Sequence, residues 1–177
     1  MSPKPSEHAL PGLAVLEQAP IIIEKILVSA TDAEMLWKPA MDRWSVSEVL
    51  AHLADTEVHV FRGRIEKMTK EKNPALPSHD QNEAYQRGEY SQGTGRENLK
   101  KFCHERDRSL SMLRYLSPDL LGRTGQHEKL GPITIEQLMN EWAFHDLGHV
   151  RQIAELFRAK AFYPNAGPFQ QFYQVKP

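Results

Sequence analysis

The chain has 177 residues, of which 40% are hydrophobic and 25% are charged, the composition of an ordinary globular protein with a sizeable core. Its 22 Lys and Arg residues nearly balance its 23 Asp and Glu residues, giving a formal net charge of -1. This balance argues against a large electrostatic surface for nucleic acid or for an anionic membrane. We therefore expect a partner among small molecules, with no nucleic acid and no membrane.

The N-terminal segment is proline-rich and carries no pattern of a signal peptide. We predict a flexible arm over residues 1–12, followed by a single domain over 13–177 in the cytoplasm. The sequence has one cysteine, Cys103, so it cannot form an internal disulfide. Because Cys103 lies in an apolar helical pattern, we expect a buried and unreactive thiol.

Two helices are predicted in the first half of the chain. The first covers about 13–29 and is interrupted by Pro20. A connection over 31–44 contains Trp37, which we expect to be exposed. The second helix begins with a capping box from Ser45 to Glu48 and continues with helical apolar spacing to about residue 70. The following connector over 71–93 is long and includes a short helical stretch at 80–86.

Two further helices are predicted in the second half. The third begins with a box from Thr94 to Glu97 and runs to about 116, and the fourth runs from Thr134 to about 159. Residues 117–133 between them read as a loop. The tail over 161–177 is rich in aromatic residues. We expect it to form a flap packed over the domain, and we favour this interpretation over a homodimer contact. No segment has a convincing strand pattern.

The predicted fold class is all-α, because every long segment has helical apolar spacing. Four long amphipathic helices predict a four-helix bundle. The 71–93 connector is long enough to travel the length of a helix. The second and third helices can therefore run parallel, with a long crossover between them.

The fourth helix carries the chemistry in the middle of its apolar stripe, where His145, His149 and Gln152 interrupt the hydrophobic residues. Histidines four residues apart lie on one helix face, about 6 Å apart along the axis, so both can reach one metal ion. The alternative is that each histidine bonds a buried side chain. The zinc-protease pattern does not apply, because Asp146 and not Glu follows His145.

A metal site with two histidines needs a third protein ligand. The second helix offers His52 and His59, which repeat with helical spacing but lie about 10.5 Å apart along the axis and cannot share one ion. Cys103 is a further candidate. Periodicity does not choose among the three.

Two segments, WSVSEVLAHLADTE (44–57) and EWAFHDLGHVRQI (141–153), resemble the signature segments of the DinB-like (DinB/YfiT) superfamily of metal-binding proteins. LPSHDQNEAY (76–85) and HEKLGPITIEQL (127–138) are similar to that family as well. The resemblance covers about 13–160. It implies a four-helix bundle with a parallel crossover and a metal site of His52, His145 and His149, so it selects His52 over His59.

The resemblance also implies which metals and reactions to consider. It suggests one divalent transition metal ion, zinc or nickel first and iron or manganese as alternatives. Family members include thiol S-transferases, so transfer of a low-molecular-weight thiol is the favoured chemistry and metal-dependent hydrolysis is the second. The alternative is a non-catalytic metal-binding or stress-response module. Three protein ligands leave a coordination position open, which favours an enzyme; no catalytic acid or base can be named.

Several neighbouring residues could accept hydrogen bonds from the imidazoles or line the rim of the site. A metal-bound imidazole usually donates its second N–H, and Gln152 is the leading acceptor because it lies in the stripe. Asp55 and Asp146 follow, although we expect both to face solvent. We also expect surface positions for loop residues and for a basic stretch of the second helix: His79, Asp80, Tyr85, His127, Arg62, Arg64, Lys67, Lys70 and Lys72.

Overall fold

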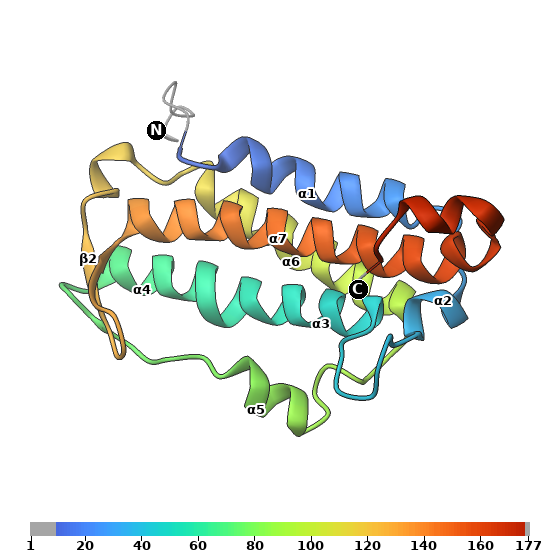
Figure 1. The fold of residues 1–177 in the computed structure, drawn as a ribbon. Helices are drawn as coiled ribbons and strands as arrows, with labels where there is room; N and C mark the ends of the chain where they lie inside the picture. Colours follow the sequence, from blue (N-terminus) through green and yellow to red (C-terminus); the bar gives the residue numbers. More distant parts are fainter. Residues whose placement is uncertain (1–9, 176–177) are drawn as a thin grey trace.

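The computed structural model describes residues 10–175 and consists mainly of four long helical stretches packed side by side (Figure 1). These stretches are α1 (Leu13–Ile26), the continuous run α3–η1–α4, α6 (Gly95–Leu113) and α7 (Ile135–Ala161). The predicted four-helix bundle is confirmed. None of the described helices has the length and apolarity needed to cross a lipid bilayer.

Short elements connect and extend the bundle. They are α2 (Asp32–Leu36), α5 (Gln81–Gln86), the 3-10 helices η2 (Pro118–Leu120), η3 (Tyr163–Asn165) and η4 (Gly167–Phe172), and the strands β1 (Ala75–Leu76), β2 (Thr124–His127) and β3 (Gly131–Thr134).

Capping boxes begin three of the four bundle stretches, as the sequence predicted. In each box the hydroxyl oxygen of the first residue accepts a hydrogen bond from the backbone N–H three positions later, and the side chain there bonds back. These reciprocal bonds satisfy amides that the first helical turn would otherwise leave free. The pairs are Ser45–Glu48, Thr94–Glu97 and Thr134–Gln137.

The first bundle helix begins differently. Gly12 precedes α1 with φ +71°, and a Cβ at this position would lie 2.6 Å from the Cβ of Ala143. Leu10 is buried in the core. Residues 10–12 of the predicted arm therefore pack with the bundle, whereas residues 1–9 lie outside the described residues.

The second and third bundle stretches run in the same direction. Near their starts, the side-chain amide of Asn98 donates to the hydroxyl oxygen of Ser47 at 3.0 Å. Near their ends, Arg62 donates to the hydroxyl oxygen of Ser109 at 3.2 Å. The connector that contains α5 joins the two stretches in the sequence and carries the chain back along the outside of the bundle (Figure 1). This arrangement confirms the predicted parallel crossover.

A π-helical segment divides the second stretch into α3 (Val46–Thr56), η1 (Glu57–Arg62) and α4 (Gly63–Lys70). The wider turn changes which residues face inward. Glu57 and Arg62 are buried, whereas the side chain of His59 is 64% exposed. Gly63 suits the end of the π segment, because a Cβ there would lie 2.5 Å from the carbonyl oxygen of Val58. A regular α-helical repeat would place the His59 side chain on the inner face, whereas the π segment turns it outward.

A small three-stranded sheet lies at one end of the bundle, where the sequence predicted only loops. β1 pairs with β2 in parallel, and β2 pairs with β3 in an antiparallel hairpin that leads directly into α7. Strands of two and four residues are too short for an alternating apolar pattern to show. The hairpin matters for function because it forms one wall of a cavity beside the central histidines.

The aromatic tail lies at the end of the bundle opposite to β2 (Figure 1). Of its rings, Phe162 packs edge-to-face against Phe157, with ring centroids 5.5 Å apart. Phe169, Phe172 and Tyr173 are each more than half exposed, so most of the tail does not form the predicted flap. No described tail residue lines either of the two cavities beside the histidines. Trp37, which we expected to be exposed, packs partly buried against the core.

Candidate metal centre

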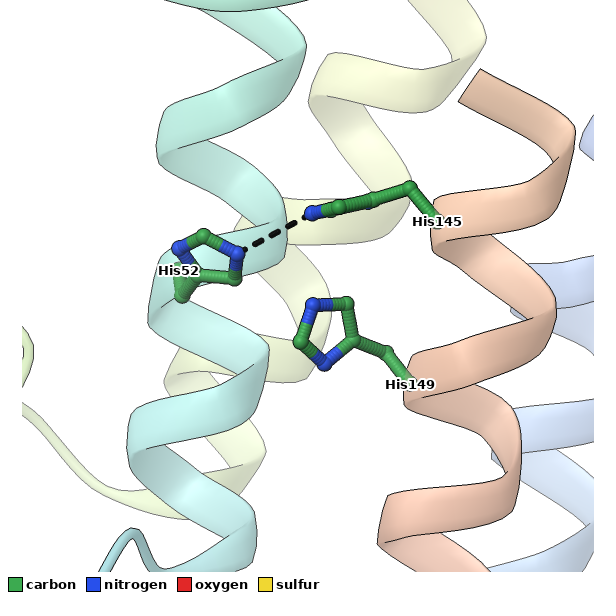
Figure 2. A group of neighbouring side chains, drawn as sticks. All are labelled: His52, His145 and His149. Atoms are coloured by element: carbon green, nitrogen blue, oxygen red, sulfur yellow. Dashed lines mark hydrogen bonds between the residues drawn. The ribbon is translucent and has the colours of Figure 1, made fainter. Parts of the chain in front are cut away.

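Three histidines from two neighbouring helices converge in the middle of the bundle. His52 comes from α3, and His145 and His149 come from successive turns of α7 (Figure 2). Their ligand nitrogens lie within 4.8 Å of one another, and the Nε2 atoms of His52 and His145 are 3.1 Å apart. The structure thus brings together the three residues that the sequence resemblance selected.

Burial keeps the imidazoles of His52 and His149 uncharged. His52 is 1% exposed, and burial lowers its pKa to about 2, with further contributions from His149 and His145. Burial, followed by the charge of His145, lowers the pKa of His149 to about 4. An uncharged imidazole keeps the nitrogen lone pair that a metal ion needs.

A hydrogen-bond chain fixes the orientation of His52. The Nδ1 atom of His52 lies 3.5 Å from the hydroxyl oxygen of Tyr90, and that hydroxyl donates to Asp55 at 2.8 Å. Because the Tyr90 proton is directed to Asp55, the Nδ1–H of His52 is the donor to Tyr90. The Nε2 lone pair of His52 then points toward the other two histidines.

Asp55 therefore acts on His52 through Tyr90 and does not face solvent freely; its side chain is 20% exposed. The Nε2 atom of His79 lies 2.7 Å from Asp55 Oδ2, the same oxygen that accepts the hydrogen bond from Tyr90. Burial, and then the hydrogen bond to Asp55, raise the pKa of Tyr90, so its hydroxyl remains protonated. Sequence reasoning missed Tyr90, because it lies in an irregular connector that has no periodicity.

Gln152 occupies the position predicted from the helix stripe. Its side-chain oxygen lies 2.8 Å from Nδ1 of His149 and accepts the Nδ1–H. The Nε2 atom of His149 is consequently left with a free lone pair. Two of the three histidines thus have the tautomer that suits metal binding through Nε2.

The environment of His145 includes a buried ionic cluster. Asp146, which we expected in solvent, has a 1% exposed side chain and accepts a hydrogen bond from Arg106 at 2.7 Å, so that prediction is wrong. Arg106 also donates to Glu57, which accepts a third bond from the indole N–H of Trp142 at 2.9 Å. Helical spacing puts Arg106 on the apolar face of α6 with Leu99, Phe102 and Leu113, but it gives no sign of the carboxylates that pair with it there.

The donor set fits a divalent transition metal ion. Two nitrogens that each lie about 2.1 Å from one tetrahedral ion are about 3.4 Å apart, close to the observed 3.1 Å between His52 and His145. Neutral imidazoles suit zinc and nickel and also accept iron. Of the other candidate ligands, His59 points outward, and the half-buried Cys103 contacts Glu24 at 3.7 Å. Burial raises the pKa of Cys103 to about 11, as expected for an unreactive thiol.

Two cavities meet at the histidine cluster. The larger one, about 690 Å³, includes His52 and His145 in its lining and extends toward the hairpin. The other, about 570 Å³, includes His145 and His149. Glu141, one helical turn before His145, lines both cavities. The cluster is therefore accessible to a molecule of substrate size.

The larger cavity also includes residues that the sequence placed on the surface. His79 and Arg64 contribute to its lining from the crossover and from α4, and His127 contributes from the hairpin. Their sequence positions gave no signal, because loop packing brings them together. Arg62 is buried and pairs with Glu105, so the solvated face predicted for this basic stretch is wrong for Arg62, whereas Arg64 is partly buried.

Most of the chain matches a known protein family. Residues 16–153 match the family model described as the DinB superfamily, which covers more than half of the sequence. The chain belongs to the DinB superfamily. A relative from Oceanobacillus iheyensis named "Putative metal-dependent hydrolase" is 25% identical over 146 residues, covering 82% of this chain and 83% of the relative.

A solved structure supports the same fold. YfiT from Bacillus subtilis, described as "a probable metal-dependent hydrolase with an unusual four-helix bundle topology", superimposes with a TM-score of 0.75. The match covers 89% of this chain and 93% of YfiT at 23% identity. At this identity the similarity establishes the shared fold, including the parallel crossover, and leaves the reaction to be argued from the site.

Proposed function

We propose that this DinB superfamily protein is a metal-dependent enzyme that holds one divalent transition metal ion between His52, His145 and His149 and hydrolyses a small molecule. The observation that carries the proposal is the convergence of three imidazoles, one buried and two partly buried, where two cavities meet. Three protein ligands leave room for water or substrate at the ion. A bound ion would supply Lewis acidity and lower the pKa of a coordinated water.

The residues around the cluster support specific roles. Tyr90 and Gln152 accept the outer N–H groups of His52 and His149, so these two rings keep one orientation. We propose Glu141 as the proton acceptor during hydrolysis, because it is a carboxylate residue that lines both cavities beside His145. A general base must lie within reach of the water that it deprotonates. The sequence alone did not identify this residue.

Thiol S-transfer is the second candidate reaction. A cavity of about 690 Å³ has room for two reactants, a small thiol and its electrophile, beside His52. In this reaction the site would hold the thiol as thiolate. Hydrolysis ranks first because both relatives carry that description in their names. A non-catalytic metal-binding module remains the alternative if neither activity is found.

The experiment compares both reactions on protein loaded with zinc or nickel. One arm measures hydrolysis of a panel of carboxylic esters and amides, and the other measures conjugation of small thiols to 1-chloro-2,4-dinitrobenzene. We expect metal-dependent hydrolysis that is lost in His52→Ala and falls by about 100-fold in Glu141→Gln, the size of a general-base contribution. Conjugation without hydrolysis would favour the second reaction. Metal-independent turnover, or none in either arm, would contradict the enzyme proposal.

A further inference from the structure

The larger cavity has an uneven distribution of charge along its wall. Its lining contains two permanent cations, Arg64 from α4 and Lys129 from the hairpin turn. Glu141 is the carboxylate of this lining, and it lies at the histidine end on α7. The end of the cavity near α4 and the hairpin is therefore positive, and an anionic group would be favoured there.

Arg64 has no ionic partner among the described residues. Its recorded side-chain hydrogen bond goes from Nη2 to the carbonyl oxygen of Pro77 at 2.8 Å. By contrast, Arg62 pairs with Glu105 at 2.5 Å, and Arg106 pairs with Asp146 at 2.7 Å. The two buried arginines thus have carboxylate partners. Arg64 is only partly buried, and it lines the cavity with donors left over.

The absence of a carboxylate partner has a free-energy cost. Arg64 is half-buried, and burial lowers its pKa from the ordinary arginine value, although it remains fully charged near neutral pH. Burial also lowers the pKa of the nearby His127, and the charge of Arg64 adds to this shift. A partly desolvated cation is stabilised when an anion pairs with it. The arrangement is therefore suited to a ligand that brings its own negative charge.

The spacing along the helix defines the shape of such a ligand. His52, Thr56, Val60 and Arg64 all line the cavity at intervals of four residues. Because part of this stretch is π-helical, the Cα atoms of His52 and Arg64 lie somewhat closer than the roughly 18 Å that twelve α-helical residues would span. Apolar side chains occupy the length between the two ends; they include Val60, Phe61, Ile133 and Leu138.

We propose that Arg64 binds the carboxylate of an elongated substrate whose apolar body lies along the cavity and whose reacting group reaches the histidine cluster. A carboxylate matches the planar guanidinium, which can donate two parallel hydrogen bonds. Lys129 adds a second, exposed positive charge at the same end. The orientation of the substrate rests on the proposed hydrolytic function, whereas carboxylate binding at Arg64 requires no metal.

The test uses the full-length, metal-free protein and isothermal titration calorimetry. The probes are 4-phenylbutyrate and its neutral counterpart 4-phenylbutyramide, which share the apolar body and differ in the charged end. We expect the acid to bind about tenfold or more tightly than the amide, as a charge-assisted hydrogen bond implies. Arg64→Gln should remove this preference while leaving the affinity for the amide unchanged.

Two variants serve as controls. Lys70→Gln removes a cation of the same helix that lies outside the cavity and pairs with Glu66, so it should retain the wild-type preference. Arg64→Lys keeps the charge but loses the planar fork, and it should keep part of the preference. If Arg64→Gln fails to fold by circular dichroism, Arg64→Lys decides: a full wild-type preference would overturn the role of the guanidinium.

Other results would overturn the inference directly. Equal affinity for acid and amide, an undiminished preference in folded Arg64→Gln, or no binding of the acid at about 10 mM would each do so. The result is separable from the proposed function. Retained carboxylate selectivity in a protein that shows no hydrolysis with metal would contradict the enzyme proposal and leave the Arg64 site supported.

Discussion

Nδ1 of His145 and Oδ1 of Asp146 face each other across 3.9 Å, and neither buried atom has a hydrogen-bond partner within residues 10–175. The gap is too long for a hydrogen bond but short enough to close with a small rotation of the ring. An imidazole that binds a metal through Nε2 usually donates its Nδ1–H to a carboxylate. The other oxygen of Asp146 is held by Arg106 at 2.7 Å, so the acceptor is already in place.

Replacing the acceptor of His145 should weaken metal binding. We predict that Asp146→Asn lowers zinc affinity by about 10- to 100-fold, the usual effect of removing such an outer partner. Affinity is measured by competition with a chromophoric chelator. Asp107→Asn, on the exposed face of α6, is the matched control and should leave affinity unchanged. Wild-type affinity in folded Asp146→Asn would show that Asp146 does not orient His145.

The phenol that accepts from His52 should have a separate effect. Tyr90→Phe removes the acceptor of the Nδ1–H and disconnects Asp55 from the ring. We predict a fall in zinc affinity of about tenfold. Tyr85→Phe is the control, because the Tyr85 hydroxyl contacts Lys38 and Arg43 and does not contact a histidine of the cluster. A loss of the same size in both variants would indicate a general disturbance of this connector.

The contact between His79 and Asp55 predicts a specific pH dependence. Asp55 lies 2.7 Å from Nε2 of His79 and raises the pKa of His79 above its ordinary value near 6.5. The resulting stabilisation is fully present below the unfolded-state pKa and is lost as pH rises through the folded-state pKa. NMR titration of His79 should give a midpoint above 6.5 and a lower one in Asp55→Asn. An unchanged midpoint in that variant would contradict the pairing.

Removing a bound metal should weaken the protein without unfolding it. Large apolar clusters hold both ends of the bundle, and the buried Arg106–Glu57–Trp142 network joins three of its stretches without a metal. Binding of an ion adds about 2.7 kcal/mol at a hundredfold excess over the dissociation constant. Circular dichroism of chelator-treated protein should show retained helicity and a lower melting temperature. Loss of helicity on chelation would indicate a structural metal instead.

The regular helices were predictable from the sequence because capping and periodicity are local signals. Ser45, Thr94 and Thr134 mark three helix starts, and the length of the connector allowed the parallel crossover. The π segment was not predictable, since the same residues fit a regular helix, and it turned His59 outward. The short strands lie below the length at which alternation is visible.

The residues of the site also fall into those that local sequence patterns predict and those that they do not. His145, His149 and Gln152 follow from one helix stripe, and the structure places all three together. The choice of His52 needed the family resemblance, because helical spacing fits His59 equally well. Tyr90 and Arg64 reach the site through loop packing and side-chain direction, which leave no periodic pattern. Long-range packing therefore supplies the residues that surround the histidines.

The most direct test of the metal centre is elemental analysis of protein that is purified without an affinity tag and reconstituted separately with zinc, nickel, iron and manganese. The structure predicts about one ion per chain, as a single three-imidazole site implies. His52→Ala should lose tight binding, whereas His59→Ala, whose side chain points outward from the same helical stretch, should retain it. Absence of metal from the reconstituted wild-type protein, or equal loss in both folded variants, would contradict the proposed centre.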